Sequence, residues 1–148
     1  MPRLDAGRVA TWRVFGLVAA DLQRRVEAGL LEDYDLPLSW FEILAALQAS
    51  GGSMRVGDLC DALHELPSSL SRRLDRLEEE GFVHRAATPM PDDKRAVTVS
   101  LTREGRAEWR DANITFRRMV QQHFASALTD TDIAALQRIF GKLENWPG

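Results

Sequence analysis

Hydrophobic positions in the middle of the chain predict two short helices with a turn between them. The first is expected over residues 55–64, and the second from about Ser68 to the glycine break at Gly81. Their core positions are leucines at helical spacing: Leu59, Leu63, Leu70, Leu74 and Leu77. The short segment Glu65-Leu66-Pro67 separates the two patterns, so a helix-turn-helix is predicted.

A hairpin is predicted directly after these helices. Two β-prone runs, Phe82-Val83 and residues 97–101, are separated by residues 88–95, which contain two prolines and two aspartates. Because proline cannot donate to a strand ladder, this separator is expected to be a turn or loop. Two helices followed by a hairpin describe a winged helix-turn-helix, which presents one helix to the DNA major groove and a loop to the neighbouring backbone or minor groove.

The N-terminal part of the chain predicts two further helices. Apolar residues at three- and four-residue steps indicate a long amphipathic helix over residues 5–28, which Gly29 ends. Residues 30–37 are expected to connect it to the next helix. Ser39 and Glu42, three positions apart, predict a capping box at the start of this second helix.

Two helices are also predicted after the hairpin. Thr102 is the expected N-cap of a helix of about 25 residues that continues through Leu128. Residues 129–132, Thr-Asp-Thr-Asp, form a second capping signal that starts a final helix. The apolar positions of that helix are Ile133, Leu136, Phe140 and Leu143.

The predicted fold class is mainly α with a small β-hairpin wing. One domain is expected over residues 1–148, with a winged helix-turn-helix module at 37–102 flanked by helices at 1–30 and 103–148. Core packing within one chain could cover the apolar stripes of the flanking helices. We favour dimerisation through them, because a protein that binds DNA half-sites usually works as a two-fold dimer with a fixed spacing.

Composition and cysteine content place the chain among globular proteins of a reducing compartment. Of its 148 residues, 45% are hydrophobic and 28% charged, and no apolar run approaches the ~20 residues that a membrane span requires. Its single cysteine, Cys60, excludes a disulfide within the chain. We therefore expect a cytoplasmic protein with no membrane segment.

The net charge of the chain restricts DNA binding to a local part of the surface. The formal charge of the chain is −3, so DNA binding must come from a local basic patch. On the second helix of the helix-turn-helix, the leucines occupy one arc, and Ser68, Ser69, Arg72 and Arg76 lie on the opposite arc. An arginine one turn into such a helix can reach a guanine or a phosphate.

An ordinary solvated face is the alternative interpretation of this helix. The two arginines on its polar arc would then form exposed ion pairs with acids of the same helix, namely Asp75, Glu79 or Glu80. The preceding helix, the turn and the hairpin favour DNA contact for Arg72 and leave Arg76 evenly balanced.

The wing offers a second basic group, Asp93-Lys94-Arg95, at the start of the return strand. An aspartate two residues before Arg95 can hold the loop while the guanidinium enters a narrow minor groove, where the negative potential is strongest. Alternatively, the triplet is a charged hairpin tip that only resists edge pairing.

In combination, these segments resemble the MarR family of bacterial transcription regulators. The matching segments are Leu70–Glu78, Gly81-Phe82-Val83 with Arg85, Asp93-Lys94-Arg95, and Val99–Thr102 with Gly105. The resemblance implies a homodimer whose terminal helices pair and whose modules bind a pseudo-palindromic operator in double-stranded DNA. It also implies that the recognition-helix contacts fall on Ser68, Ser69, Ser71 and Arg72, and the wing contact on Arg95.

Two segments depart from the family pattern. The wing loop is longer than usual around residues 88–91, which bears on the reach of Arg95. His64-Glu65-Leu66 replaces the small-residue turn often found between the two module helices, which bears on where the recognition helix begins. The full set of predicted DNA-contacting residues is Ser68, Ser69, Ser71, Arg72, Arg76, Lys94 and Arg95.

The resemblance further implies a small aromatic or amphipathic ligand, bound between the dimer helices and the DNA-binding module. Such a pocket needs apolar walls and a few polar anchors. The candidate walls are Trp12, Phe15, Trp40, Phe41 and Met54, and the candidate anchors are Arg13, Asp58 and His64. The alternative is that these aromatic residues belong to the core, which is their more common role.

No catalytic or metal-binding pattern is found. Cys60 shares a face with Leu59 and Leu63, so a buried, inert thiol is expected rather than a redox sensor. The histidines at 64, 84 and 123 lack zinc-site spacing, and neither a phosphate-binding glycine loop nor a nucleophile elbow is present. We therefore expect no enzymatic activity, no metal and no cofactor.

The sequence thus predicts a dimeric, sequence-specific DNA-binding transcription regulator. We expect a repressor whose operator affinity is tuned by a small molecule. The alternative is a winged-helix module that binds protein and uses its basic residues only for solubility.

Overall fold

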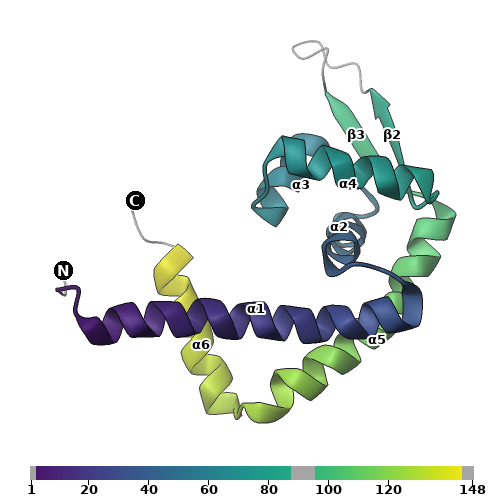
Figure 1. Ribbon diagram of the computed structural model, residues 1–148. Coiled ribbons are helices and arrows are strands. Elements are labelled where there is room, and N and C mark those ends of the chain that lie inside the picture. Colours follow the sequence, from purple (N-terminus) through teal and green to yellow (C-terminus); the bar gives the residue numbers. More distant parts are fainter. Residues whose placement is uncertain (1–2, 88–95, 145–148) are drawn as a thin grey trace. The chain divides into compact units, whose positions relative to one another are not determined.

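The computed structural model describes residues 3–87 and 96–144 and is mainly helical with a small sheet, as predicted (Figure 1). Its elements are α1 (Ala6–Tyr34), α2 (Leu38–Ala49), β1 (Ser53–Arg55), α3 (Val56–Leu63), α4 (Pro67–Glu79), β2 (Val83–Ala87), β3 (Val97–Leu101), α5 (Arg103–His123), a short 3-10 turn η1 (Ala125–Ala127) and α6 (Asp130–Glu144). The chain divides into two compact units. We call residues 30–115 the winged-helix unit, and residues 1–29 with 116–148 the terminal unit.

The core of the winged-helix unit is built from leucine faces of its short helices. Leu70, Leu74 and Leu77 of α4 are at most 1% exposed, and Leu59 of α3 is fully buried. Leu63, the fifth predicted core leucine, is only half-buried at the end of α3. The helix α2 packs against α3 and contributes further buried side chains: Phe41, Ile43, Leu44 and Leu47. The predicted helix-turn-helix is confirmed.

The sheet has one strand more than the predicted hairpin. Its order is β1-β3-β2 with both pairs antiparallel, and Val99 of β3 lies opposite Met54 of β1 and Arg85 of β2. β1 has only three residues, too few for its alternation to stand out in the sequence. β2 also continues to Ala87, beyond the predicted Phe82-Val83, because it pairs with the whole of β3. Residues 88–95 of the predicted wing loop lie outside the described residues.

Two of the predicted helix boundaries in the N-terminal half are wrong. Gly29 does not end α1, because its φ is not positive and the helix continues to Tyr34. The left-handed residue that stops the helix is Asp35, with φ 53, and Leu30 and Leu36 on either side of this end are buried. The predicted connector over residues 30–37 is therefore mostly helix. A glycine ends a helix only where the chain has to turn, and here burial of Leu30 favours continuation.

The predicted capping box at Ser39 is also wrong. The helix α2 begins at Leu38 with Pro37 as its N-cap, and no side chain caps this end. The Pro37 carbonyl accepts hydrogen bonds from the backbone N–H groups of Trp40 and Phe41, at 3.0 and 3.1 Å. Glu42 is half-buried instead, and burial raises the pKa of its carboxyl group.

Caps after the hairpin agree with the predictions. Thr102 Oγ1 accepts a hydrogen bond from the backbone N–H of Gly105 at 3.0 Å, which makes it the predicted cap of α5. Thr129 and Asp132 cap α6 reciprocally, at 2.9 and 3.2 Å. The helix α5 ends at His123 rather than Leu128, because a 3-10 turn replaces its last predicted turn.

Many large apolar side chains of the terminal unit are exposed. Trp12 and Leu17 of α1 are 73% and 71% exposed, and α6, all of which is described, buries none of its residues. Phe140 and Leu143 of α6 are 41% and 62% exposed. In the described part of the chain, core packing does not cover these helices. No helix among the described residues has an apolar stretch long enough for a bilayer span.

Gly105→Ala is expected to lower the free energy of unfolding by about 1–3 kcal/mol, because a Cβ there would meet the Phe82 carbonyl oxygen. That Cβ would lie 2.0 Å from the oxygen, which accepts a hydrogen bond from the Thr102 N–H. The control is Gly57→Ala in α3, where a Cβ meets nothing within 4 Å. This variant should be as stable as the wild type or up to about 1 kcal/mol more stable. Urea denaturation measures both, and equal stabilities would contradict the close approach.

Candidate nucleic-acid interface

The helix α4 separates a buried leucine face from an exposed polar face. It begins at Pro67, and its N-cap Leu66 has an extended backbone. The turn before α4 differs from the family pattern, yet the helix starts only one residue before the predicted Ser68. While Leu70, Leu74 and Leu77 are buried, every predicted polar position is exposed: Ser68, Ser69, Ser71, Arg72 and Arg76. A helix whose first turn carries short hydroxyl side chains can approach a DNA backbone closely.

The arginines of this face are little engaged within the chain. Arg72 forms no hydrogen bond or ion pair with any residue in the described ranges. Arg76 Nη1 lies 3.8 Å from Glu79 Oε2, and both side chains are about 70% exposed, so this pair contributes little stability. The solvated ion-pair alternative therefore describes Arg76 in part and does not describe Arg72.

Acidic groups of α4 are held by Arg85 of β2. Arg85 Nη2 is 2.5 Å from Asp75 Oδ1, and Arg85 Nε donates to Glu78 Oε2 at 3.0 Å. The same Glu78 oxygen accepts the backbone N–H of Arg85 at 3.2 Å. The hydrogen bond to Asp75, with a further contribution from Glu78, raises the pKa of Arg85. This contact links α4 to β2.

Arg73, at the flank of the polar arc, is engaged on the other side of α4. Its guanidinium forms an ion pair with Glu65 of the turn before the helix. Burial lowers the pKa of Arg73. Arg73 therefore ties the start of α4 to the preceding turn, and its charge is neutralised within the unit.

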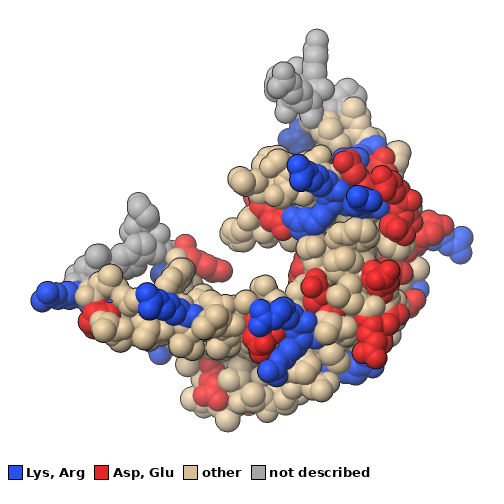
Figure 2. All heavy atoms as spheres, in the orientation of Figure 1, with Lys and Arg blue, Asp and Glu red and all other residues tan. Residues whose placement is uncertain are grey.

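Charge is unevenly distributed over the surface of the winged-helix unit (Figure 2). Basic atoms lie over the earlier part of α4, whereas acidic atoms gather at its C-terminal end and along α5. The acidic residues of that end are Glu78, Glu79 and Glu80. A net negative chain thus presents a local basic face, as DNA binding requires. The wing residues Lys94 and Arg95 lie outside the described residues.

The predicted ligand residues are divided between the two units. Trp12 and Phe15 lie in the terminal unit, with ring centroids 6.5 Å apart. In the winged-helix unit, Phe41 belongs to the core, Met54 pairs with β3, and the anchors Asp58 and His64 are exposed. Arg13 is exposed on α1.

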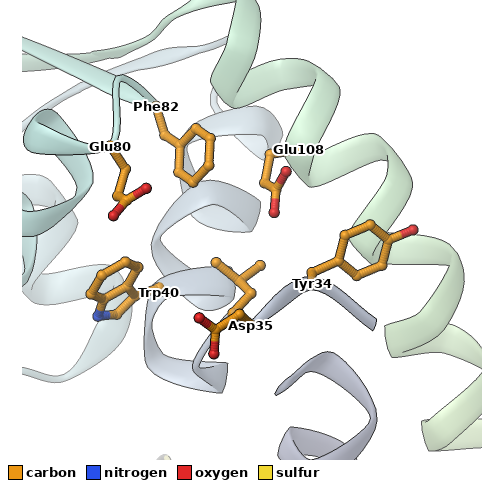
Figure 3. Close-up of a pocket in the computed structure, with 7 residues that line it drawn as sticks. Tyr34, Asp35, Trp40, Glu80, Phe82 and Glu108 are labelled. Carbon is orange, nitrogen blue, oxygen red and sulfur yellow. The ribbon is translucent and has the colours of Figure 1, made fainter. Parts of the chain in front are cut away.

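Trp40 lines a cavity of about 160 Å³ in the winged-helix unit (Figure 3). The other lining residues are Tyr34, Asp35, Leu36, Glu80, Phe82 and Glu108. They come from the end of α1 and the two residues after it, the C-cap of α4, the residue before β2, and α5, so no sequence spacing could have indicated them.

The prediction that Cys60 is buried is confirmed. Its side chain is buried, at 6% exposure. Within residues 3–87 and 96–144, no group of three or more histidine, cysteine or acidic side chains is arranged to hold a metal ion.

Comparison with known proteins identifies similar chains along almost the whole length. A sequence profile of the MarR family matches residues 34–96. The HTH-type transcriptional regulator PecS of Dickeya dadantii (strain 3937) is 30% identical over 151 residues, covering 97% of this chain and 85% of PecS. The match with PecS therefore extends over both the winged-helix unit and the terminal unit.

Solved structures with a similar fold include two proteins of Streptomyces coelicolor. AbsC, a MarR family transcriptional regulator, has a TM-score of 0.85 at 26% identity, covering 97% of this chain and 96% of AbsC. Sco3205, a MarR family transcriptional regulator solved in complex with DNA, has a TM-score of 0.87 at 27% identity. That match covers 97% of this chain and 90% of Sco3205.

Arg85→Gln is expected to lower the free energy of unfolding by about 1 kcal/mol, because the ion pairs that it removes are partly exposed. A double-mutant cycle with Glu78→Gln, measured by urea denaturation, isolates the contact between β2 and α4. The two substitutions should be less than additive. Additive effects would show that Arg85 does not stabilise α4 through Glu78.

Proposed function

The chain belongs to the MarR family of transcription regulators, and from this premise we propose that it binds an operator in double-stranded DNA as a homodimer and represses transcription. The observation that carries the proposal is the polar face of α4. Three fully or almost fully buried leucines orient this helix, and Arg72 on its opposite side is exposed and unpaired within the described residues. A DNA complex of the similar protein Sco3205 supports this use of the fold.

Roles of individual residues follow from their positions on α4. We assign base or phosphate contacts to Ser68, Ser69, Ser71, Arg72 and Arg76, with Arg72 as the principal base contact. Arg85 and Arg73 have no direct role, because acidic side chains of the chain itself neutralise them. The wing residues Lys94 and Arg95 complete the proposed interface and would contact the backbone or the minor groove.

Dimerisation is supported by the exposed apolar side chains of the terminal unit. Trp12, Leu17 and Leu143 are each more than 60% exposed, and exposure of several large apolar side chains favours an interaction site. A second copy of the chain would cover this surface and hold two α4 helices at the spacing of two half-sites.

The proposal also includes a small ligand that changes operator affinity. The cavity beside Trp40 supports it, since a pocket with aromatic walls and a few polar groups is the usual form of a ligand site. We further propose the cytoplasm as the compartment, because operator DNA lies there in bacteria such as those of the relatives.

Arg72→Ala is expected to lower the affinity for operator duplex by about 1–3 kcal/mol and to relax the preference at one base pair in each half-site. The operator is first selected from a random duplex pool, and affinities are measured by fluorescence anisotropy at several salt concentrations. The matched control is Arg110→Ala, which removes an exposed arginine of α5 and should leave affinity unchanged. If the wild type selects no duplex, the chain is instead a winged-helix module that binds protein.

Phe140→Glu in α6 is expected to convert a dimer into a monomer, because it places a charge on the exposed apolar face of the terminal unit. Sedimentation velocity at micromolar concentration measures the change. The control is Arg138→Glu, a charge change at an exposed position of the same helix, which should leave the dimer intact. A wild-type chain that sediments as a monomer would contradict both the dimer and the half-site arrangement.

A further inference from the structure

The cavity of the winged-helix unit combines aromatic rings with carboxylates and no basic group. Its lining holds Asp35, Glu80 and Glu108 beside the rings of Tyr34, Trp40 and Phe82, and includes no lysine, arginine or histidine. Figure 3 shows the carboxyl groups of Glu80 and Glu108 on either side of the Phe82 ring, with Trp40 and Asp35 across the space from that ring. Its volume is about 160 Å³, close to that of an engineered cavity that holds benzene (about 150 Å³).

These carboxylates differ from other acids of the unit because they have no partner. Among the described residues, the side chains of Asp35, Glu80 and Glu108 form no hydrogen bond or ion pair. In contrast, Asp75 and Glu78, five and two residues before Glu80, are both bound by Arg85. The acids around the cavity therefore leave a negative charge that nothing in the described chain neutralises.

The pKa of Glu108 is affected by this uncompensated charge. Burial, followed by the negative charges of Asp111 and Glu80, raises the pKa of its carboxyl group. A cation bound in the cavity would reverse both of the charge effects. The raised pKa of Glu108 therefore agrees with the geometry of the cavity in favouring a cationic ligand. A counter-ion would stabilise this half-buried, unpaired carboxylate.

We propose that this cavity binds a small organic cation, such as an amine or quaternary ammonium with a compact apolar body. Carboxylates attract the charge, and the faces of Trp40 and Phe82 favour a cation over a neutral molecule of the same size. Aromatic walls also accept the apolar groups of an alkylammonium, which a hydrated metal ion lacks. The anionic and neutral aromatic ligands that would suit a basic pocket are disfavoured here.

The cavity is joined directly to the recognition helix. Glu80 is the C-cap of α4, and Phe82 directly precedes β2. The Phe82 carbonyl accepts the Thr102 N–H at 3.1 Å, and Thr102 Oγ1 donates to the Gly81 carbonyl at 2.6 Å. A cation held between Glu80 and Glu108 would therefore act on the end of α4. This regulatory step rests on the proposed function, whereas binding of the cation does not.

Binding is tested with the full-length protein, without DNA, by titrating tetramethylammonium chloride and following the indole N–H signal of Trp40 by NMR. Sodium chloride at the same ionic strength is the reference, and tert-butanol is a neutral probe of similar size. Glu108→Gln and Glu80→Gln should each weaken binding by about tenfold. Glu104→Gln, an exposed acid one turn earlier on α5 that does not line the cavity, should bind like the wild type.

Several outcomes would overturn the cation site. One is that tert-butanol or benzoate binds as tightly as tetramethylammonium. Another is that Glu104→Gln lowers the affinity for tetramethylammonium as much as Glu108→Gln does. Trp40→Leu should also weaken the binding of tetramethylammonium more than that of tert-butanol, and an equal loss would show that the ring acts only by shape. Circular dichroism confirms that each variant is folded.

Regulation is tested separately by measuring operator affinity with and without saturating tetramethylammonium. The wild type should change its affinity at least about threefold, and Glu108→Gln should not respond at the same concentration. An operator affinity that does not change in the wild type would overturn the regulatory step. A chain that binds no operator at all would refute the proposed function, and the NMR titration would still decide the cation site.

Discussion

Burial of the leucine face of α4 is the interaction on which the arrangement of the winged-helix unit depends. Leu70, Leu74 and Leu77 are fully or almost fully buried, so the rotation of the helix about its axis is determined by the core. Removing apolar side chains of this size from water stabilises a fold by roughly 2 kcal/mol each, more than any exposed ion pair of this chain. The polar arc with Arg72 is therefore exposed as a consequence of core packing.

Ion pairs within the chain then determine which charged side chains of α4 are available to attract DNA. The chain is net negative, and basic and acidic residues are mixed along α4. Arg85 binds Asp75 and Glu78 at the side of the helix, which offsets part of the negative charge near the arginines. Arg73 is neutralised by Glu65. What remains is a basic first half of α4 and an acidic end, so a DNA duplex would be attracted to one part of the helix and repelled from the other.

The acidic end of α4 has a second consequence, because it contributes to the cavity lined by Glu80, Phe82 and Glu108. The same junction contains a close backbone approach, where Gly105 leaves room for the Phe82 carbonyl. Recognition helix, wing strand and α5 thus meet within a few residues. A contact that changes this junction acts on all three elements, and this is why an unpaired charge there bears on DNA binding as well as on stability.

The sequence alone determined the parts that depend on local physics. Helical periodicity located the short helices, the spacing of leucines identified the core face of α4, and Thr102 and Thr129 marked helix starts because their hydroxyl groups bond to nearby backbone. Tertiary structure decided the parts that depend on distant groups. The helix α1 passes Gly29 because Leu30 becomes buried, and β1 exists because β3 pairs with it. Arg85 reaches α4, and Glu80 and Glu108 line the same cavity, only after folding, because packing that no local spacing encodes brings residues far apart in sequence near one another.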